Sequence, residues 1–192
     1  MKVSADANDE AELVALVVRA QRRDRSAEAV LFERFAGKLV GMLERLLGSV
    51  ADAEDALQDT FVIALSQLGR LRDPAAVASW LTGIAVHQAQ RRFRRRRLLR
   101  VLGLDRRIRD AGLAELAAPT TPPEVRETLH RLDGLLARLA PSLRVAWMLR
   151  NVEGESLTEI ARACRCSLAT VKRRIATADA RLRKQLNIGD EP

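Results

Sequence analysis

The sequence predicts an all-α protein that consists of two small helical domains joined by a flexible linker. Ala, Leu, Arg and Glu dominate the chain, and signals for strands are almost absent. Apolar residues recur at intervals of three and four, which places them on one face of a helix. Residues 101–123 lose this periodicity and close on Pro-Thr-Thr-Pro-Pro, which is typical of a linker.

Four helices are expected in the N-terminal domain, residues 7–100. We predict them at Ala7–Arg23, Ser26–Leu47, Val50–Leu68 and Pro74–Arg100. Gly37 and Gly41 are expected to break or loosen the second helix, because glycine is a poor helix former. Asp73 followed by Pro74 is a helix-start signal, since the first helical residue does not need its N–H.

Four more helices are expected in the C-terminal domain, residues 124–187. We predict them at Pro123–Leu139, Pro141–Asn151, Ser156–Ala163 and Ser167–Leu186. Pro123 and Pro141 both stand where a first helical residue can lack its N–H. Gly154 is expected in the turn between the second and third of these helices.

Charge is distributed unevenly along the chain, whose net charge is +8. Residues 1–80 contain 10 Lys and Arg against 13 Asp and Glu, whereas residues 81–192 contain 23 against 12. A basic half attached to a mildly acidic half indicates a polyanion partner at one end and a different partner at the other. Arginine supplies most of the positive charge, and its planar fork matches phosphate oxygens and guanine edges.

The composition disfavours several classes of protein. No apolar run approaches the ~20 residues of a membrane span, and the acidic first residues do not make a signal peptide. Two cysteines, with His87 and His130 far away in sequence, are too few for a disulfide framework or a tight zinc site. We therefore expect a cytoplasmic protein with no metal and no other cofactor. No Ser, His or Cys has the spacing of a nucleophile with its base, so no enzymatic activity is expected.

Residues Ser156–Arg174 are predicted to form two helices joined by a tight turn. Ser167 is a good N-cap for the second helix. The residues expected to pack between the two helices are Leu157, Ile160, Ala161, Cys164, Cys166, Val171 and Ile175. Both cysteines then behave as small hydrophobic residues. The alternative for this pair is metal binding or redox chemistry, as in a thiol-based redox sensor.

The second of these helices has the layout of a recognition helix. Such a helix needs one apolar stripe facing inward and donors at its N-terminal end facing the major groove. The side chains expected to be exposed are Thr170, Lys172, Arg173, Arg174 and Thr177, with Arg181, Arg183 and Lys184 further on. The alternative is a basic face that is merely solvated.

Two charged clusters mark the N-terminal domain. Asp52, Glu54, Asp55 and Asp59 lie on a helix whose apolar residues, Leu57, Phe61, Val62 and Leu65, are expected to fill the domain core. The stretch Arg91–Arg97 reads RRFRRRR, and six cations in seven residues repel one another unless an anion lies alongside. DNA phosphates would supply that anion. The alternative for the acidic cluster is a face that is merely solvated, and the alternative for the basic run is a helix end that frays into solvent.

These motifs, in this order, resemble the sigma factors of bacterial RNA polymerase, in particular the extracytoplasmic-function (ECF) group. The stretch LLGSVADAEDALQDTFVIAL is similar to the family's region 2, and SWLTGIAVHQAQRRFRRRR is similar to the last helix of that domain. The stretch LARLAPSLRVAWMLRNVEGESLTEIARACRCSLATVKRRIATADARLRKQL is similar to region 4. The resemblance covers nearly the whole chain.

The resemblance implies a role for each cluster. Asp55, Gln58 and Asp59 would dock on the clamp helices of the polymerase. The −10 promoter element would meet His87, Gln88, Arg91, Arg92, Arg94 and Arg95, and the loop Leu68–Asp73 would take up a base extruded from the non-template strand. The −35 element would meet Thr170, Lys172, Arg173, Arg174, Thr177 and Arg181.

The implied partners are core RNA polymerase, through the clamp helices of its largest subunit and its flap, promoter DNA and an anti-sigma factor. The free protein is expected to be a monomer that does not insert into membranes. The chain departs from the family at several positions. Leu71 and Val77 stand where aromatic residues are usual, His87 where Asn is common, Ala169 in place of a Gly and Arg165 in place of a turn Gly. The alternative function is a helix-turn-helix regulator that acts without polymerase.

Overall fold

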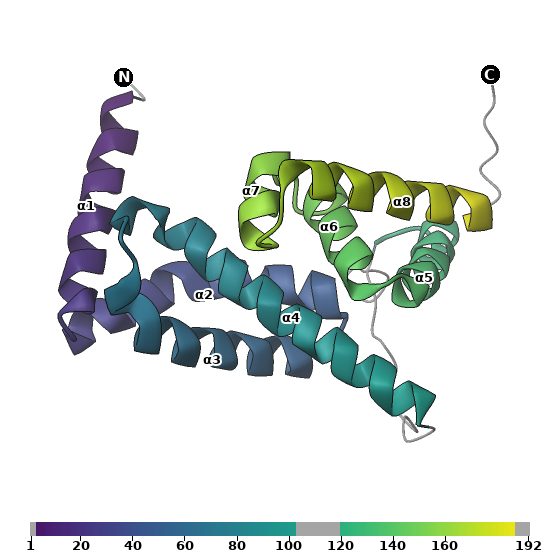
Figure 1. The fold of residues 1–192 in the computed structure, drawn as a ribbon, viewed down its shortest axis with the longest axis horizontal. Coiled ribbons are helices and arrows are strands. Elements are labelled where there is room, and N and C mark those ends of the chain that lie inside the picture. The colour runs from purple at the N-terminus through teal and green to yellow at the C-terminus, as the bar shows by residue number, and fades with distance from the viewer. Residues whose placement is uncertain (1–2, 103–119, 187–192) are drawn as a thin grey trace.

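The computed structural model describes residues 3–102 and 120–186, and those residues are helical with no strand. Figure 1 shows the helices in chain order. They are α1 (Val3–Gln21), α2 (Arg25–Leu47), α3 (Val50–Gln67), α4 (Val77–Val101), α5 (Pro123–Arg138), α6 (Pro141–Asn151), α7 (Leu157–Ala163) and α8 (Leu168–Leu186), with the short 3₁₀ turns η1 (Leu68–Arg70) and η2 (Pro74–Ala76) between α3 and α4. The all-α prediction is confirmed.

Capping residues explain where several helices begin. Asp24 caps α2 by accepting hydrogen bonds from the backbone N–H of Ser26 and Ala27, and Ser49 caps α3 through Asp52. Pro123 and Pro141 stand at the first turns of α5 and α6, as predicted.

Two local expectations were wrong. Gly37 and Gly41 do not interrupt α2, which runs unbroken to Leu47. Each glycine costs about 1 kcal/mol in a helix interior, but α2 buries leucines along its length, including Leu39, Leu43 and Leu46, and this burial outweighs the cost. The segment starting at Pro74 begins as a 3₁₀ turn, and α-helical geometry starts only at Val77.

The N-terminal domain packs α2, α3 and α4 against one another, and α1 packs on α2 and on the two 3₁₀ turns. Phe61 of α3 is buried and meets the ring of Phe32 edge-on, with 4.7 Å between ring centroids. Its neighbour Val62 was expected in the core but is 64% exposed, because it lies on the opposite side of α3. Trp80 of α4 is half-buried against the core.

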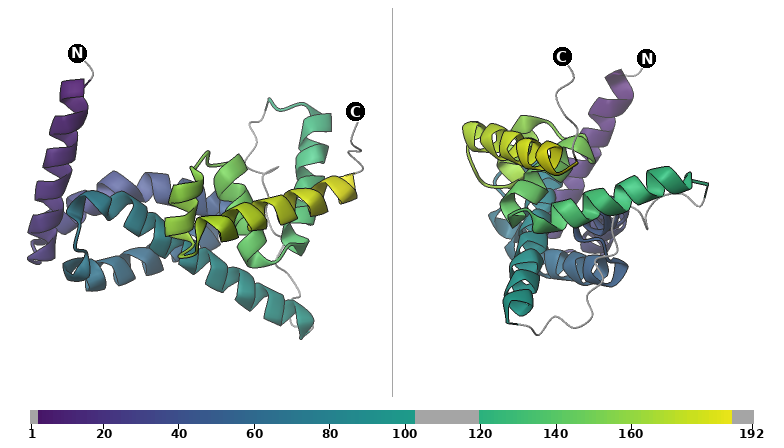
Figure 2. Two further views of the ribbon diagram at one scale, coloured as in Figure 1. Left: turned by 45° about the horizontal axis from the view of Figure 1, so that its top comes forward. Right: turned by 90° about the vertical axis from the view of Figure 1, so that its right-hand side faces the viewer.

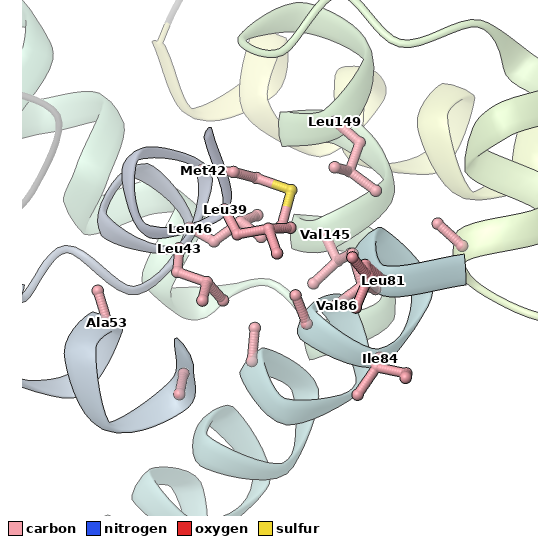
Figure 3. Packing of buried hydrophobic residues seen from close by; sticks show 14 of the residues in the cluster. Leu39, Met42, Leu43, Leu46, Ala53, Leu81, Ile84, Val86, Val145 and Leu149 are labelled. Carbon is pink, nitrogen blue, oxygen red and sulfur yellow. The ribbon is translucent and has the colours of Figure 1, made fainter. Parts of the chain in front are cut away.

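The two domains are in contact, because α4 packs against α6 and α7 as well as against its own domain. Figure 2 shows the C-terminal helices beside α4, which α6 and α7 contact. One cluster of buried residues runs from α2 through α4 into α6, and Figure 3 shows Leu81 and Val86 near Val145 and Leu149 within it.

Close helix packing, an ion pair and a cation–π contact hold the interface between the two domains, called the seam below. Gly83 of α4 lies so near α7 that a Cβ placed on it would stand 3.7 Å from the backbone of Ala163. Arg45 of α2 donates two hydrogen bonds to the carboxylate of Glu153, at 2.5 and 2.8 Å. This partner raises the pKa of the guanidinium. The guanidinium of Arg144 stacks on the ring of Phe93, 4.5 Å from its centroid.

The expected linker, residues 101–123, is only partly visible in the structure. Val101 still belongs to α4, and Pro123 already belongs to α5. Residues 103–119, which make up most of the expected linker, lie outside the described residues. The boundaries 7–100, 101–123 and 124–187 therefore stay predictions. Within the two described ranges, no helix combines the length and the apolar character that crossing a membrane requires.

Candidate nucleic-acid interface

The turn between α7 and α8 is a Schellman motif with arginine at the position that glycine usually occupies. Arg165 has φ 48°, in the left-handed region. Its N–H donates to the carbonyl of Arg162 at 3.1 Å, and the next N–H, of Cys166, donates to Ala161 at 3.0 Å. These two bonds fix the angle at which α8 leaves α7, so the tight turn predicted from the sequence forms despite the missing glycine.

Hydroxyl caps define the start of both helices. Ser156 and Glu159 form a capping box on α7, in which each side chain accepts a hydrogen bond from the other's backbone N–H. The hydroxyl of Ser167 accepts from the N–H of Thr170 at 3.2 Å, as predicted for an N-cap of α8. The Ser156 bonds lower the pKa of Glu159.

Both cysteines lie against the buried cluster but are only partly buried. Burial, reinforced by the neighbouring Cys166, raises the pKa of the Cys164 thiol to about 11. A guanidinium nitrogen of Arg174 lies 3.5 Å from the sulfur of Cys166. A thiol with a raised pKa is a poor nucleophile, so this environment does not favour redox chemistry at Cys164.

The helix α8 separates an inner apolar stripe from an outer basic face. Val171, Ala178 and Leu182 are buried. On the outer face Lys172, Arg173 and Arg181 are exposed, whereas Thr170, Arg174 and Thr177 are half-buried at its edges. The hydroxyl of Thr177 donates to the carbonyl of Arg173 at 2.7 Å and so stays close to the helix. This is the arrangement that a groove-binding helix requires.

A second basic ridge follows α4. His87, Arg91, Arg94 and Arg95 are exposed at spacings of four, three and one, which places them along one side of the helix. Burial, followed by the charges of Arg94, Arg165 and Arg91, lowers the pKa of His87. Arg165 belongs to the turn before α8, so the ridge on α4 and the helix-turn-helix share one region of positive potential.

The other arginines of the RRFRRRR run that can be placed face α3 instead. Arg92 donates to the carboxylate of Asp59 at 2.9 Å. Arg96 is buried, donates to the carbonyl of Leu47 at 3.0 Å and pairs with Asp52. Acidic residues of the same domain thus supply part of the negative charge that the sequence analysis assigned to DNA. Gln88, predicted to face DNA, is only 3% exposed.

The acidic surface of α3 is exposed next to these pairs. Glu54, Asp55, Gln58 and Asp59 all lie in solvent, with the exposed Val62 one turn further along. Asp59 also takes part in the pair with Arg92, so a residue predicted to bind polymerase touches one predicted to bind DNA. No group of three or more His, Cys, Asp or Glu in residues 3–102 and 120–186 is arranged to hold a metal ion.

Sequence reasoning did not identify the side chains that hold the loop between α3 and α4. The side-chain amide of Gln21, at the end of α1, donates to the carbonyls of Leu68 and Leu71. The residues that Gln21 contacts lie about fifty positions away in the sequence, and the helical periodicity of the sequence does not indicate such a long-range pairing. Val77, the first residue of α4, is fully buried and Leu71 of the loop is half-buried, so both of these aliphatic side chains pack inward.

Comparisons with known proteins identify both domains. Residues 31–98 match the family model "Sigma-70 region 2", and residues 129–182 match "Sigma-70, region 4". The RNA polymerase sigma-H factor of Pseudomonas aeruginosa is 31% identical, over 89% of this chain and 92% of that protein. The ECF RNA polymerase sigma-E factor of Haemophilus influenzae is 31% identical, over 85% of this chain and 89% of that protein.

Solved structures share the fold. CnrH, in complex with the cytosolic domain of CnrY, has a TM-score of 0.61 at 24% identity, covering 93% of this chain and 99% of that one. The sigma factor RpoE in complex with the anti-sigma factor NepR from Bartonella quintana has a TM-score of 0.58 at 22% identity, covering 83% and 96%. With both domains matched in order and relatives aligned over most of their length, this chain belongs to the ECF sigma factors of RNA polymerase.

Proposed function

We propose that this sigma factor binds core RNA polymerase, directs it to promoters with −10 and −35 elements, and assists the opening of DNA near the start site. As a sigma factor it is a transcription initiation factor and not an enzyme. The observation that carries the finer proposal is the pair of basic surfaces on separate domains, the outer face of α8 and the ridge on α4. A regulator that acts without polymerase would not need the exposed acidic surface of α3.

At the −35 element, α8 enters the major groove with its N-terminal residues toward the base edges. Lys172 and Arg173 are exposed near the start of the helix and reach bases, while Arg181 lies two turns further along and reaches phosphate. Thr170, Arg174 and Thr177 line the edges of this contact.

At the −10 element, the exposed ridge of α4 tracks the DNA backbone. His87, Arg91, Arg94 and Arg95 stand outward and supply cations to phosphate. Arg92 and Gln88 join this contact only after they leave their present surroundings, the pair with Asp59 and the buried interior. The loop of residues 68–73 takes up a base of the non-template strand.

Asp55, Gln58 and Asp59 dock on the clamp helices of the polymerase, and region 4 meets the flap. We further propose that the chain acts in the cytoplasm, is a monomer when free, and is held inactive by an anti-sigma factor. Support for the last point comes from the structural relatives, one of which is a sigma factor in complex with an anti-sigma factor.

Run-off transcription tests the proposal as a whole. Purified chain is added to core polymerase on a library of promoter fragments. Transcripts that start at a fixed distance from shared −10 and −35 sequences are expected, and they should depend on both proteins. Binding of the chain to the same fragments without polymerase, together with no transcript in its presence, would instead establish the polymerase-independent regulator.

The docking surface has its own test. Asp55→Lys combined with Asp59→Lys should weaken binding to core polymerase by about 2–4 kcal/mol, because cations would then face the partner where carboxylates did. The matched control is Glu10→Lys with Glu12→Lys, the same reversal at two exposed positions of α1. Affinity is measured by fluorescence anisotropy. If the two double variants bind core polymerase equally well, the docking assignment to α3 is wrong.

A further inference from the structure

Gln21 connects the N-terminal helix to the loop between α3 and α4. Its side-chain amide nitrogen donates to the carbonyl oxygen of Leu68 at 3.1 Å and to that of Leu71 at 2.8 Å. The N–H of Leu71 itself donates to the carbonyl of Leu68 at 3.0 Å and closes the bend. One amide group therefore fixes both ends of a single turn of the loop.

The backbone that carries Gln21 is itself held firmly. Arg23, with φ 67°, forms a second Schellman motif, in which the N–H of Arg23 and Asp24 donate to the carbonyls of Ala20 and Arg19. Asp24 caps α2 and also accepts two hydrogen bonds from the guanidinium of Arg19, at 2.9 and 2.7 Å. The hydroxyl of Ser26, followed by the guanidinium of Arg19, holds the pKa of Asp24 well below its usual range. These hydrogen bonds fix the backbone at the end of α1, and therefore the position from which the Gln21 side chain extends.

The loop has an inner side and an outer side. Leu68 is buried and Leu71 is half-buried against the core, whereas Gly69, Arg70, Arg72 and Asp73 are exposed. Because the carbonyls held by Gln21 belong to the two inner residues, the amide determines where the outer side chains stand. Figure 1 shows α1 beside this loop, and α1 packs on both 3₁₀ turns.

We propose that Gln21 is a positioning residue that sets the base preference of the loop of residues 68–73. The inference rests on the proposed function, in which this loop takes up an extruded base of the −10 element. It adds that α1, which lies outside the matched span of residues 31–98, takes part in promoter choice through one side chain. Gln21 touches no DNA; it acts by keeping the loop in the shape that admits the preferred base.

Three variants test this role. Gln21→Glu keeps the size of the side chain but removes the donor, and Gln21→Met removes it without adding charge. The matched control is Gln67→Glu, which adds the same negative charge beside the loop at an exposed residue whose side chain makes no capping hydrogen bond. Each holoenzyme, the chain with core polymerase, binds forked DNA randomised over the −10 element, and the bound fraction is sequenced.

Both Gln21 variants should lose about fivefold or more of the preference for one base at one position, since a mismatched base within a read site costs at least that much. Gln67→Glu should weaken all sequences alike and keep the preference. Core affinity, binding to −35 duplex and melting temperature should stay close to wild type. If both Gln21 variants keep the wild-type preference, or lose affinity evenly like the control, Gln21 has no positioning role. A wild-type holoenzyme with no base preference in this element would overturn the proposed function of the loop as well.

Discussion

Two arginines in left-handed backbone conformations shape the places where this chain departs most from regular helices. Arg23 ends α1 and Arg165 ends α7, each in a Schellman motif that usually carries glycine. A side chain in this region costs about 1 kcal/mol relative to glycine. The cost is offset at both sites by the two backbone hydrogen bonds of the motif and by the helix cap that follows. The sequence indicated the turn at Arg165 through the N-cap Ser167 and through the resemblance, in which Arg165 stands in place of a turn glycine.

The environment of Cys164 leads to a pH-dependent prediction. Its pKa is raised to about 11 by burial and by Cys166, so the reactive thiolate should be scarce at neutral pH. In a Cys166→Ser variant, the rate of alkylation by iodoacetamide should keep rising beyond pH 9, whereas the same protein in denaturant should level off near 9, the ordinary value. Mass spectrometry measures both rates. Equal pH profiles for the folded and unfolded chains would show that burial does not protect Cys164.

At the scale of the helix, α8 and α4 differ in how they use their cations. The described arginines of α8 face solvent or the helix edge, whereas α4 directs Arg92 and Arg96 toward acidic residues of α3 and presents Arg91, Arg94 and Arg95 outward. A helical periodicity locates the charged positions but does not say which acidic partner a neighbouring helix will bring. This is why the sequence identified the RRFRRRR run as a DNA contact without anticipating that part of it is structural.

The layout of α8 predicts that substitutions at its two ends affect DNA binding differently: one reduces base preference, and the other reduces affinity for all sequences. Arg173→Ala should cost about 1–3 kcal/mol on the preferred −35 element and relax the preference at one or two positions, because Arg reads guanine through paired donors. Arg181→Ala should weaken all sequences alike and lower the salt slope by about one. Holoenzyme binding is measured over single-base variants at several salt concentrations. An even loss over the panel for Arg173→Ala would make this residue a phosphate contact, and Lys172 would be the next to test.

Helix positions were predictable because their signals are local. The starts of α2, α3, α5, α6 and α8 lie within one residue of prediction, since Asp, Ser and Pro act on the adjacent turn. The expected break at Gly37 and the burial of Val62 failed because packing against other helices decides both. The contact surfaces that rest on family motifs stay predictions. The contacts of Gln21, Arg45 and Glu153 could not be predicted, because their partners lie tens of residues or more away in the sequence.

At the scale of the whole molecule, α4 serves both domains. One side belongs to the N-terminal bundle, another packs on α6 and α7, and the ridge from His87 to Arg95 remains in solvent. The sequence predicted two domains and a linker, and it contained no signal that the two would share a core. That arrangement depends on matched surfaces, such as Gly83 against Ala163 and Arg45 against Glu153, that only the fold brings together.

The seam can be detected through His87. Its pKa is lowered below the ordinary 6.5 by burial and then by the charges of Arg94, Arg165 and Arg91. Arg165→Gly removes a cation contributed by the other domain, so the pKa of His87 should rise toward 6.5. NMR titration of the imidazole measures it. Arg162→Ala, which removes an exposed cation of α7 that does not act on His87, is the control.

The sign of the effect on stability follows from the direction of the shift. Because folding lowers the pKa of His87, its neutral ring is favoured in the folded chain, and the associated stability is present above about pH 6.5 and lost as the pH falls through the lowered value. Arg165→Gly should reduce that loss on the acid side. An unchanged pKa in Arg165→Gly would mean that the two domains are apart in solution.

The continuous buried cluster also bears on whether the chain can be cut into independent pieces. Leu149 and Ile160 line one pocket together with Ser79 and Thr82 of α4, so separating the domains would expose apolar surface on both sides. In calorimetry the intact chain should therefore melt in a single heat-capacity peak, with equal van't Hoff and calorimetric enthalpies. Fragments of residues 1–102 and 120–192, produced separately, should melt at lower temperatures and bind a hydrophobic dye. Mixing them should restore part of the lost heat, because each fragment carries one half of a common interior.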